Sequence, residues 1–362
     1  MKKQIGNFKT KIMIFTGVLV LGIFCSGFLV NDLDEKVKTA YNLRIGGEVD
    51  EAKTLLDQII DKDSTNAMAW FELARTQHHM MLGGAGYSPE NILTSVNKAV
   101  HYDMDNVIYA YYQANICFLN AYSSKENTSD YVSKSCEAFE NVLKLKPDYK
   151  EAILILVEIY GLLPVEMGGD KSEAESYASS LDGLDKFYYE KANAILMAED
   201  ADKISYWEKI LKANPGNARV MEELGKAYIF NDDIENGMMY MEKAAQLNPE
   251  NYIPQINMAR VYVMMLMQNK GDKEKNLELA QNAFKQYLEE NPDEINPLKA
   301  YSLGWIAKIN GFEGNSEEAK KLSAEAKSLD PYFSRAFGIP PGYLYSSPVD
   351  LSDSYSSYFS PF

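Results

Sequence analysis

The chain has 362 residues, with 36 basic against 52 acidic side chains and a formal net charge of −16. Without the four lysines among the first eleven residues, the net charge is about −20. A body this acidic repels phosphate backbones, so we expect no nucleic-acid partner. The length suits either one sizeable core or one long repeat array.

The first thirty residues differ from the rest of the chain. Four lysines precede an uncharged apolar run at residues 12–30. This layout is typical of an export signal, and the run is also long enough for an uncleaved anchor. Gly27 allows cleavage, whereas Phe24 disfavours lipidation of Cys25. We predict that residues 1–30 are a signal peptide or N-terminal membrane anchor, and that the body lies in the periplasm or on the extracytoplasmic face of the membrane.

A repeated helical pattern accounts for most of the body. In residues 218–251, Leu224, Gly225 and Tyr228 fall on one face of a first helix. A polar turn and a second helix follow, and Pro249 ends the second helix. This segment resembles the tetratricopeptide repeat (TPR), a helical hairpin of 34 residues. Its one departure from the family pattern is Gly237, where the family usually has alanine.

The same register recurs along the chain, and prolines close its helices at Pro147, Pro215, Pro249, Pro292 and Pro331. About eight units fit between Leu33 and Phe333, with the poorest match near 184–217. Single hairpins bury too little surface alone, so the units must stack. We therefore predict an all-α fold, a right-handed superhelix of about eight TPR-type hairpins over residues 33–333.

A tail rich in proline, serine and tyrosine follows at residues 334–362. Prolines and glycine interrupt any long helix there, so we predict a non-helical tail. Its aromatic content suggests that it lies in a groove, its own or a neighbour's, and simple fraying is the alternative. Because it carries Asp350, Asp353 and the carboxylate of Phe362, we hypothesise that it contacts a basic concave face within the same molecule.

A glycine pair, Gly168-Gly169, precedes Asp170 where a helix is expected to begin. Similar turns start at Gly47 and Gly314. We align these turns at Gly47, Gly169 and Gly314, and interpret all three as hairpin bends in which this glycine, in a left-handed conformation, ends one helix and polar residues cap the next. The spacing of a phosphate-binding loop is absent.

The loop before this turn, residues 163–167, is longer than the repeat requires. Similar loops occur in exported proteins that resemble the periplasmic TPR accessory subunit of TRAP-type transporters. This resemblance implies a partner in solute uptake or envelope assembly.

Few residues suggest catalysis or metal binding. The string from His78 to Met81 contains ligand types that suit copper, but no second cluster accompanies it. Helix packing is the alternative, and we predict no metal, no cofactor and no enzyme activity. Cys117 and Cys136 can form a disulfide in an oxidising compartment, or remain two buried free thiols.

The TPR resemblance implies that the first helix of each unit lines a concave, ligand-facing surface. Its ninth position is occupied by Tyr41, Arg75, Asn115, Glu158, Lys226, Arg260 and Lys308, four of which are basic. Cations between aromatic side chains suit a carboxylate or an acidic peptide. We predict a non-catalytic scaffold in the cell envelope that binds a protein or peptide through this face. The predicted contact residues are Arg44, Phe71, Arg75, Tyr111, Asn115, Arg219, Lys226, Arg260 and Lys308.

Two alternatives remain open at this point. One is an accessory subunit of a solute-uptake system, similar to the TPR component of TRAP-type transporters. The other is a metal-handling protein or an enzyme built around His78. The composition of the concave face does not distinguish the first alternative from the scaffold, because the TPR fold supports many unrelated functions.

Overall fold

The computed structural model describes residues 32–123, 128–247, 253–292 and 294–335. Within these ranges the regular structure is helical, with no β-strand. None of the helices in them is both long and apolar enough to cross a membrane. The predicted signal or anchor, 1–30, and all but the first two residues of the predicted tail, 334–362, lie outside the described residues.

Eight consecutive helical hairpins form the described body, which confirms the predicted all-α superhelix. The first hairpin joins a helix at residues 32–45 to α2 (Val49–Lys62). The following hairpins are α3 (Ala67–Leu82) with α4 (Pro89–Tyr102), α5 (Val107–Ser123) with α6 (Thr128–Leu145), α7 (Lys150–Leu162) with α8 (Lys171–Ser180), α9 (Lys186–Leu196) with α10 (Lys203–Ala213), α11 (Ala218–Phe230) with α12 (Ile234–Leu247), α13 (Ile253–Met267) with α14 (Lys273–Glu290), and α15 (Asn296–Phe312) with α16 (Ser316–Leu329).

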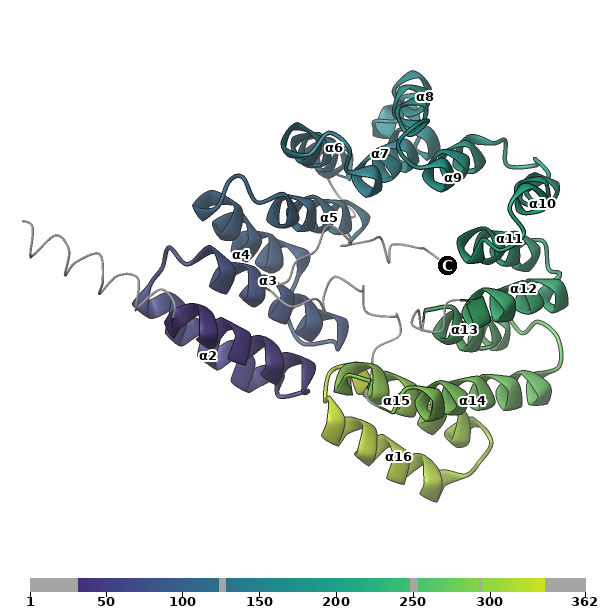
Figure 1. Ribbon diagram of the computed structural model, residues 1–362. Coiled ribbons are helices and arrows are strands. Elements are labelled where there is room, and N and C mark those ends of the chain that lie inside the picture. Colours follow the sequence, from purple (N-terminus) through teal and green to yellow (C-terminus); the bar gives the residue numbers. More distant parts are fainter. Residues whose placement is uncertain (1–31, 124–127, 248–252, 293, 336–362) are drawn as a thin grey trace, which may run out of the picture.

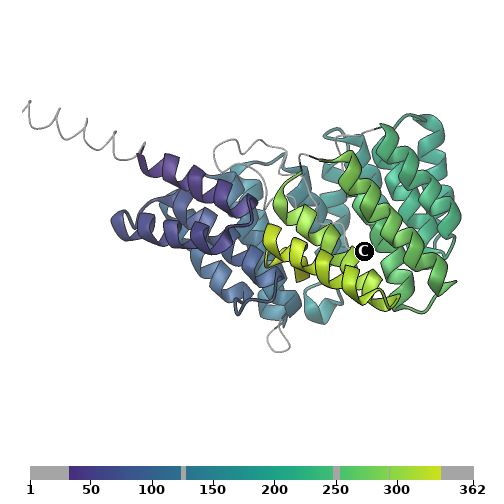
Figure 2. The ribbon, with the colours of Figure 1, turned by 90° about the horizontal axis from the view of Figure 1, so that it is seen from below.

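The hairpins follow one another around a ring (Figure 1). First helices such as α5, α11 and α15 lie toward the inside, and second helices such as α6, α10 and α16 lie toward the outside. Figure 2 shows the last hairpin beside the first two, so that the two ends of the array meet. The inner face of the ring is therefore built from the first helices, as the repeat pattern predicts.

Close backbone contact inside the hairpins depends on small residues. A β-carbon added at Gly237 would lie 2.5 Å from Cγ1 of Ile229 and 2.9 Å from the carbonyl oxygen of Gly225. Helices α11 and α12 thus cross more tightly than an alanine would permit. This explains why Gly237 replaces the small alanine that is usual in the family pattern.

The hairpin that matched the pattern least well is also the least regular. Helices α9 and α10 have only 11 residues each. They meet through side chains: Phe187 lies 6.3 Å from Trp207 between ring centroids, and the hydroxyl of Tyr206 donates to the carbonyl of Glu190. Large aromatic side chains replace the small residues that would allow closer helix approach.

The loop with the glycine pair is a structured bend. Pro164 precedes a short 3₁₀ turn, η1 (Val165–Met167), and Asp170 accepts hydrogen bonds from the amides of Ser172 and Glu173. The interpretation as a hairpin turn is consistent with these contacts, because Asp170 occupies amides that a phosphate would need.

The position of the left-handed glycine in this bend was wrong by one residue. Gly168 has φ 97°, like Gly47 at 86° and Gly314 at 84°. Gly169 is instead required for space, because a β-carbon there would lie 1.8 Å from the carbonyl oxygen of Leu163. Side-chain capping also differs among the sister turns, since Asp170 caps its helix but Glu48 and Asn315 do not.

The two ends of the array are joined by residues 329–334, which we call the seam. Asp330 is buried; it lies 2.8 Å from Nε2 of His79 and also accepts from the amides of Tyr332 and Phe333. The Phe333 ring is fully buried, 4.2 Å from the His79 ring. These contacts connect the last hairpin to α3 through one short segment.

Further contacts extend the seam to the first hairpin. The hydroxyl of Tyr332 donates to Asp50 (2.8 Å), and Nδ2 of Asn296 donates to the carbonyl of Gly46 (2.8 Å). Glycines allow this approach: a β-carbon on Gly47 would lie 1.7 Å from the carbonyl oxygen of Leu329. The described body is therefore a closed ring of hairpins.

Candidate partner-binding face

All nine residues predicted to contact a partner lie on first helices of hairpins. The structure places six of them in buried positions, two in half-buried positions and one in an exposed position. The buried residues are Arg44, Phe71, Arg75, Tyr111, Asn115 and Lys226, the half-buried ones are Arg260 and Lys308, and the exposed one is Arg219.

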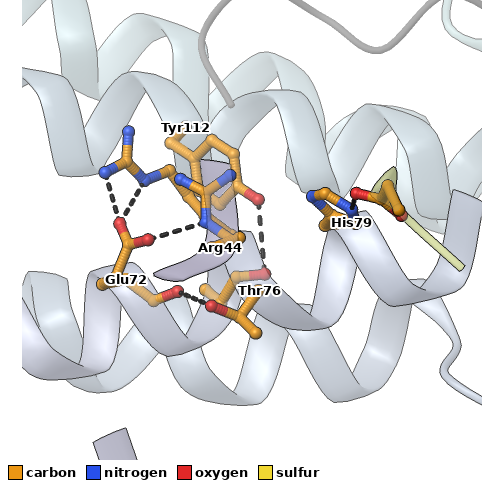
Figure 3. Close-up of polar contacts among 8 residues, drawn as sticks. Arg44, Glu72, Thr76, His79 and Tyr112 are labelled. Atoms are coloured by element: carbon orange, nitrogen blue, oxygen red, sulfur yellow. Dashed lines mark hydrogen bonds and ion pairs between the residues drawn. The ribbon is translucent and has the colours of Figure 1, made fainter. Parts of the chain in front are cut away.

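Arg44 and Arg75 share one carboxylate, that of Glu72 (Figure 3). Nε of Arg44 donates to Oε1 of Glu72 (2.7 Å), and Nε of Arg75 donates to Oε2 (2.9 Å). Nη2 of Arg75 also pairs with Oε2. All three side chains are fully buried. We call Arg44, Arg75 and Glu72 together the arginine pair, in which two guanidinium groups share one carboxylate.

The second half of the Arg44 guanidinium lacks a partner. Nη1 and Nη2 are shielded from solvent and make no hydrogen bond. A buried donor without an acceptor costs about 1–3 kcal/mol, and more when the group is charged. These two donor atoms of Arg44 are therefore enclosed by the fold without an acceptor.

Aromatic rings hold the arginine pair in place. The guanidinium carbon of Arg75 lies 4.8 Å from the centroid of the Phe71 ring and 5.7 Å from that of Tyr41. Phe71 stacks on Tyr109 at 4.5 Å. Cation–π contacts of this kind fix the orientation of a guanidinium whose other contacts are ionic. Phe71 is therefore a buried side chain that packs against Arg75 and Tyr109, and its ring is not exposed to a partner.

Tyr111 and Asn115 take part in packing on α5. Nδ2 of Asn115 donates to the carbonyl of Tyr111 (2.7 Å), and the Tyr111 ring lies 4.8 Å from that of Tyr149. Burial raises the pKa of the Tyr111 hydroxyl well above its usual range. Both residues therefore stabilise the joint between α5 and its neighbours.

Lys226 belongs to a second charged group, which we call the central cluster. Its Nζ lies 3.1 Å from carboxylate oxygens of both Glu222 and Glu223, and Glu223 also pairs with Lys191 of α9 at 3.0 Å. Burial opposes both charges, yet the two lysines lower the pKa of Glu223 to about 2, and the glutamates raise that of Lys226. The cluster thus joins two lysines and two glutamates from α9 and α11.

Glu158 of α7 lies in the field of the same cluster. Burial raises the pKa of its carboxyl to about 7, with Lys191 acting to lower it and Glu223 to raise it. Its carboxyl therefore changes charge near neutral pH, which no other residue in the predicted ninth positions is shown to do.

The remaining predicted cations lie near aromatic or polar groups. Arg219 is 4.4 Å above the Phe187 ring and 3.6 Å from Asp185. Nη1 of Arg260 donates to Oδ1 of Asn257 (3.3 Å), and Nζ of Lys308 lies 4.3 Å above the Trp305 ring. Burial lowers the pKa of Lys308. Arg260 and Lys308 come from α13 and α15, the first helices of the last two hairpins.

The histidine string on α3 has structural contacts. Nδ1 of His78 lies 3.1 Å from the Tyr112 hydroxyl, and His79 pairs with Asp330 in the seam. Burial lowers the pKa of His78 to about 3. Across the described residues, no group of three or more metal-ligating side chains occurs. The packing alternative considered for this string accounts for both rings.

Cys117 of α5 and Cys136 of α6 are both buried free thiols in the structure. Burial raises the pKa of Cys117 to about 11 and also raises that of Cys136. Thiols with raised pKa values react slowly, because the thiolate is the reactive form. The structure therefore shows the second alternative for Cys117 and Cys136, two buried free thiols.

The acidic partners were missed in the sequence, although a signal for them exists. Glu72 precedes Arg75 by three residues, and Glu222 and Glu223 precede Lys226 by four and three. Such spacings place opposite charges side by side on a helix. Counting only the ninth positions therefore overstated the basic character of the central part of the face.

Comparison with known proteins gives one family match. Residues 218–251 match the model of the tetratricopeptide repeat. No curated protein matches the chain. These residues are α11, α12 and the segment that follows, the unit in which the pattern is clearest.

Several solved structures are similar to this chain at low identity. Yeast Tom70 is 16% identical over 83% of this chain and 69% of its own, with a TM-score of 0.35. A thermophilic TPR protein of Thermus thermophilus is 12% identical over 64% and 99%, with a TM-score of 0.37. MamA is 18% identical over 58% and 94%, with a TM-score of 0.30.

Proposed function

We propose that this protein is a non-catalytic scaffold of the cell envelope that binds a protein or peptide partner through the inner face of its ring. The observation that carries the proposal is the placement of the charged side chains. Arg219, Arg260 and Lys308 belong to first helices, which lie toward the inside of the ring, and each of them keeps some solvent exposure. A stacked, rigid face presents such groups at low ordering cost to a ligand.

The chemistry of the face supports a partner with acidic groups. Arg219 is exposed and Arg260 is half-buried, so both guanidinium groups are accessible to a ligand. Guanidinium groups recognise carboxylates through paired hydrogen bonds. The C-terminal tail, 334–362, is proposed to contact the same face within the molecule.

The location in the envelope is supported by residues 1–30 alone. Their basic start and apolar run are typical of export signals or N-terminal anchors. We propose that they direct the body to the periplasm or the extracytoplasmic face of the membrane. Attachment to the membrane through any other part of the chain is not proposed.

A second candidate is an accessory subunit of a solute-uptake system. The loop at residues 163–167, which prompted this idea, exposes apolar side chains: Val165 is 81% exposed and the neighbouring Leu162 is also exposed. An exposed apolar group on a structured bend suits a protein contact. A metal-handling or enzymatic role around His78 is not pursued, because both histidine rings are buried and engaged in packing.

The proposal is tested by capturing partners from envelope extracts with the tagged chain. Arg219→Glu with Arg260→Glu reverses charge at the accessible part of the inner face and should remove the specific partner. The matched control is Lys320→Glu with Lys321→Glu, which changes the same charge on the outer helix α16, where both side chains are exposed. Retention of every partner by the inner-face variant would overturn the proposal.

The identity of the captured protein separates the two candidates. A membrane permease that is lost on Leu162→Ser with Val165→Ser, but kept by the Arg219 and Arg260 variant, would favour the uptake role. A partner with the opposite response favours the scaffold.

A further inference from the structure

The two ends of the ring meet through the seam. Among the described helices that carry labels, neither α2 nor α3 packs extensively on α15 or α16. The seam instead lies in a slot lined by glycines. A β-carbon at Gly83 would lie 2.4 Å from Cβ of Tyr332. One at Gly304 would lie 2.4 Å from the carbonyl oxygen of Ser334. The ring is therefore closed by a short segment that fits closely into one place, rather than by a broad interface between helices.

The buried polar centre of the seam is the contact between His79 and Asp330. Oδ1 of Asp330 accepts from the amides of Tyr332 and Phe333, and Oδ2 lies 2.8 Å from Nε2 of His79. Asp330 is thus the acceptor, and Nε2 of His79 is the donor. Nδ1 of His79 is shielded from solvent and makes no hydrogen bond. A second proton would place an N–H donor at Nδ1 without an acceptor, and a buried donor of this kind is unfavourable.

The ionisable side chains around His79 come from three elements: Arg44 of helix 32–45, Glu72 and His78 of α3, and Asp330 and Tyr332 of the seam. Burial has the largest effect and lowers the pKa of His79. Asp330 and Glu72 act to raise this pKa, whereas Arg44 acts to lower it. A histidine released from the seam regains its ordinary pKa of 6.5. The closed ring is therefore favoured above pH 6.5 and loses stability as the pH falls below that value.

We propose that the seam is a proton-operated switch: uptake of a proton by His79 releases residues 329–334 from the glycine-lined slot and opens the ring between its first and last hairpins. The hairpins stay folded, because each of them packs on its neighbours in the chain. Opening uncovers the parts of α3 and α15 that the seam contacts. The switch goes beyond the proposed function and does not depend on it, since opening involves this chain alone.

Opening is measured by hydrogen exchange on the full chain at pH 7.5 and 5.5, with rates corrected for the intrinsic effect of pH. The amides of Tyr332 and Phe333, which donate to Asp330 in the closed ring, should exchange about ten-fold faster at pH 5.5. The factor follows because pH 5.5 is one unit below the ordinary pKa of 6.5 that His79 regains on opening. Amides of α12 are the internal reference and should not change. Unchanged exchange at the seam, or an equal change in α12, would overturn the switch.

His79→Gln separates the switch from a general response to acid. The glutamine amide can still donate to Asp330 but takes up no proton, so the corrected rates at the seam should be the same at both pH values. The matched control is His78→Asn, which keeps a polar group toward the hydroxyl of Tyr112 and leaves His79 in place. Its seam should respond to acid as the wild type does. A full acid response in His79→Gln would overturn the role of His79, and so would loss of the response in His78→Asn.

Gly83→Ala tests the slot without changing any ionisable group. Its methyl group would displace Tyr332, whereas Gly86→Ala in the same loop places a methyl group with nothing within 4 Å. Gly83→Ala should raise exchange at the seam about ten-fold at pH 7.5, and Gly86→Ala should match the wild type. Equal rates in the two variants would overturn the slot as the place that holds the seam. None of these measurements uses a partner, so a failed capture experiment would count against the proposed function alone.

Discussion

The arginine pair and the central cluster both place charged side chains on first helices, yet they differ in burial. At the arginine pair, two cations share Glu72 and all three side chains are inaccessible to water. In the central cluster, two lysines meet two glutamates, and each side chain keeps some solvent contact. The comparison teaches that burial, rather than the number of ion pairs, separates a charged group enclosed by the fold from one that remains open to solvent.

Substitution of the shared carboxylate should give the largest difference between the two regions. Glu72→Gln keeps the shape but removes the fully buried carboxylate that both guanidinium groups share, which should lower the free energy of unfolding by about 3–5 kcal/mol. Glu223→Gln should cost only about 1–2 kcal/mol, because Glu222 still pairs with Lys226. Urea unfolding followed by circular dichroism measures both. Equal losses would show that burial of the ion pairs does not distinguish the regions.

The seam should respond almost as strongly to loss of its buried ring. Phe333→Ala removes a fully buried side chain that packs on His79, and should destabilise the ring by about 3 kcal/mol. Phe312→Ala is the control, since Phe312 is 68% exposed on the end of α15. We expect faster hydrogen exchange in α3 and α15 for Phe333→Ala alone. Unchanged exchange in both helices would mean that Phe333 does not hold the ends together.

The repeats could be predicted from sequence because their signals are local. The stripe of Leu224, Gly225 and Tyr228 and the closing proline define one hairpin without reference to any other. The capping role of Asp170 is likewise contained within a few residues. Hence the hairpin number and the all-α class agree with the structure, while Gly168 and Gly169 were exchanged because a one-residue register is finer than such patterns resolve.

The seam could not be predicted in this way. Contact between His79 and Asp330 joins residues 251 positions apart, and it depends on the summed rotation of all intervening hairpins. A small change in the angle of each repeat would separate the ends. The burial of Arg44 has a similar origin, because the group lies where helix 32–45, α3 and the seam come together.

Substitution of Gly47 and of Gly314 distinguishes the cost of the left-handed backbone from the cost of losing space at the seam. Gly47 and Gly314 have nearly the same φ, at 86° and 84°, but only Gly47 has a neighbour within reach of a β-carbon. Gly314→Ala should cost about 1 kcal/mol through the left-handed backbone, and Gly47→Ala about 2 kcal/mol, because it also displaces Leu329. Thermal unfolding compares them. A cost at Gly47 no larger than that at Gly314 would argue against tight closure at this turn.

The smallest expected effect is a difference in the response to pH. Burial raises the pKa of Glu158 from 4.5 to about 7, so the unfolded chain releases this proton more readily. The contribution of Glu158 to the free energy of unfolding is present below pH 4.5. It is lost as the pH rises toward 7, and the loss is roughly 1 kcal/mol after allowance for water near the carboxyl.

His78 has the opposite effect. Its pKa of about 3 in the fold contributes stability that is lost as the pH falls below 6.5. Hydrogen exchange corrected for intrinsic rates should therefore show α7 gaining protection and α3 losing it between pH 7.5 and 5. Glu158→Gln should abolish the change in α7 only, and a parallel response of both helices in that variant would refute the assignment.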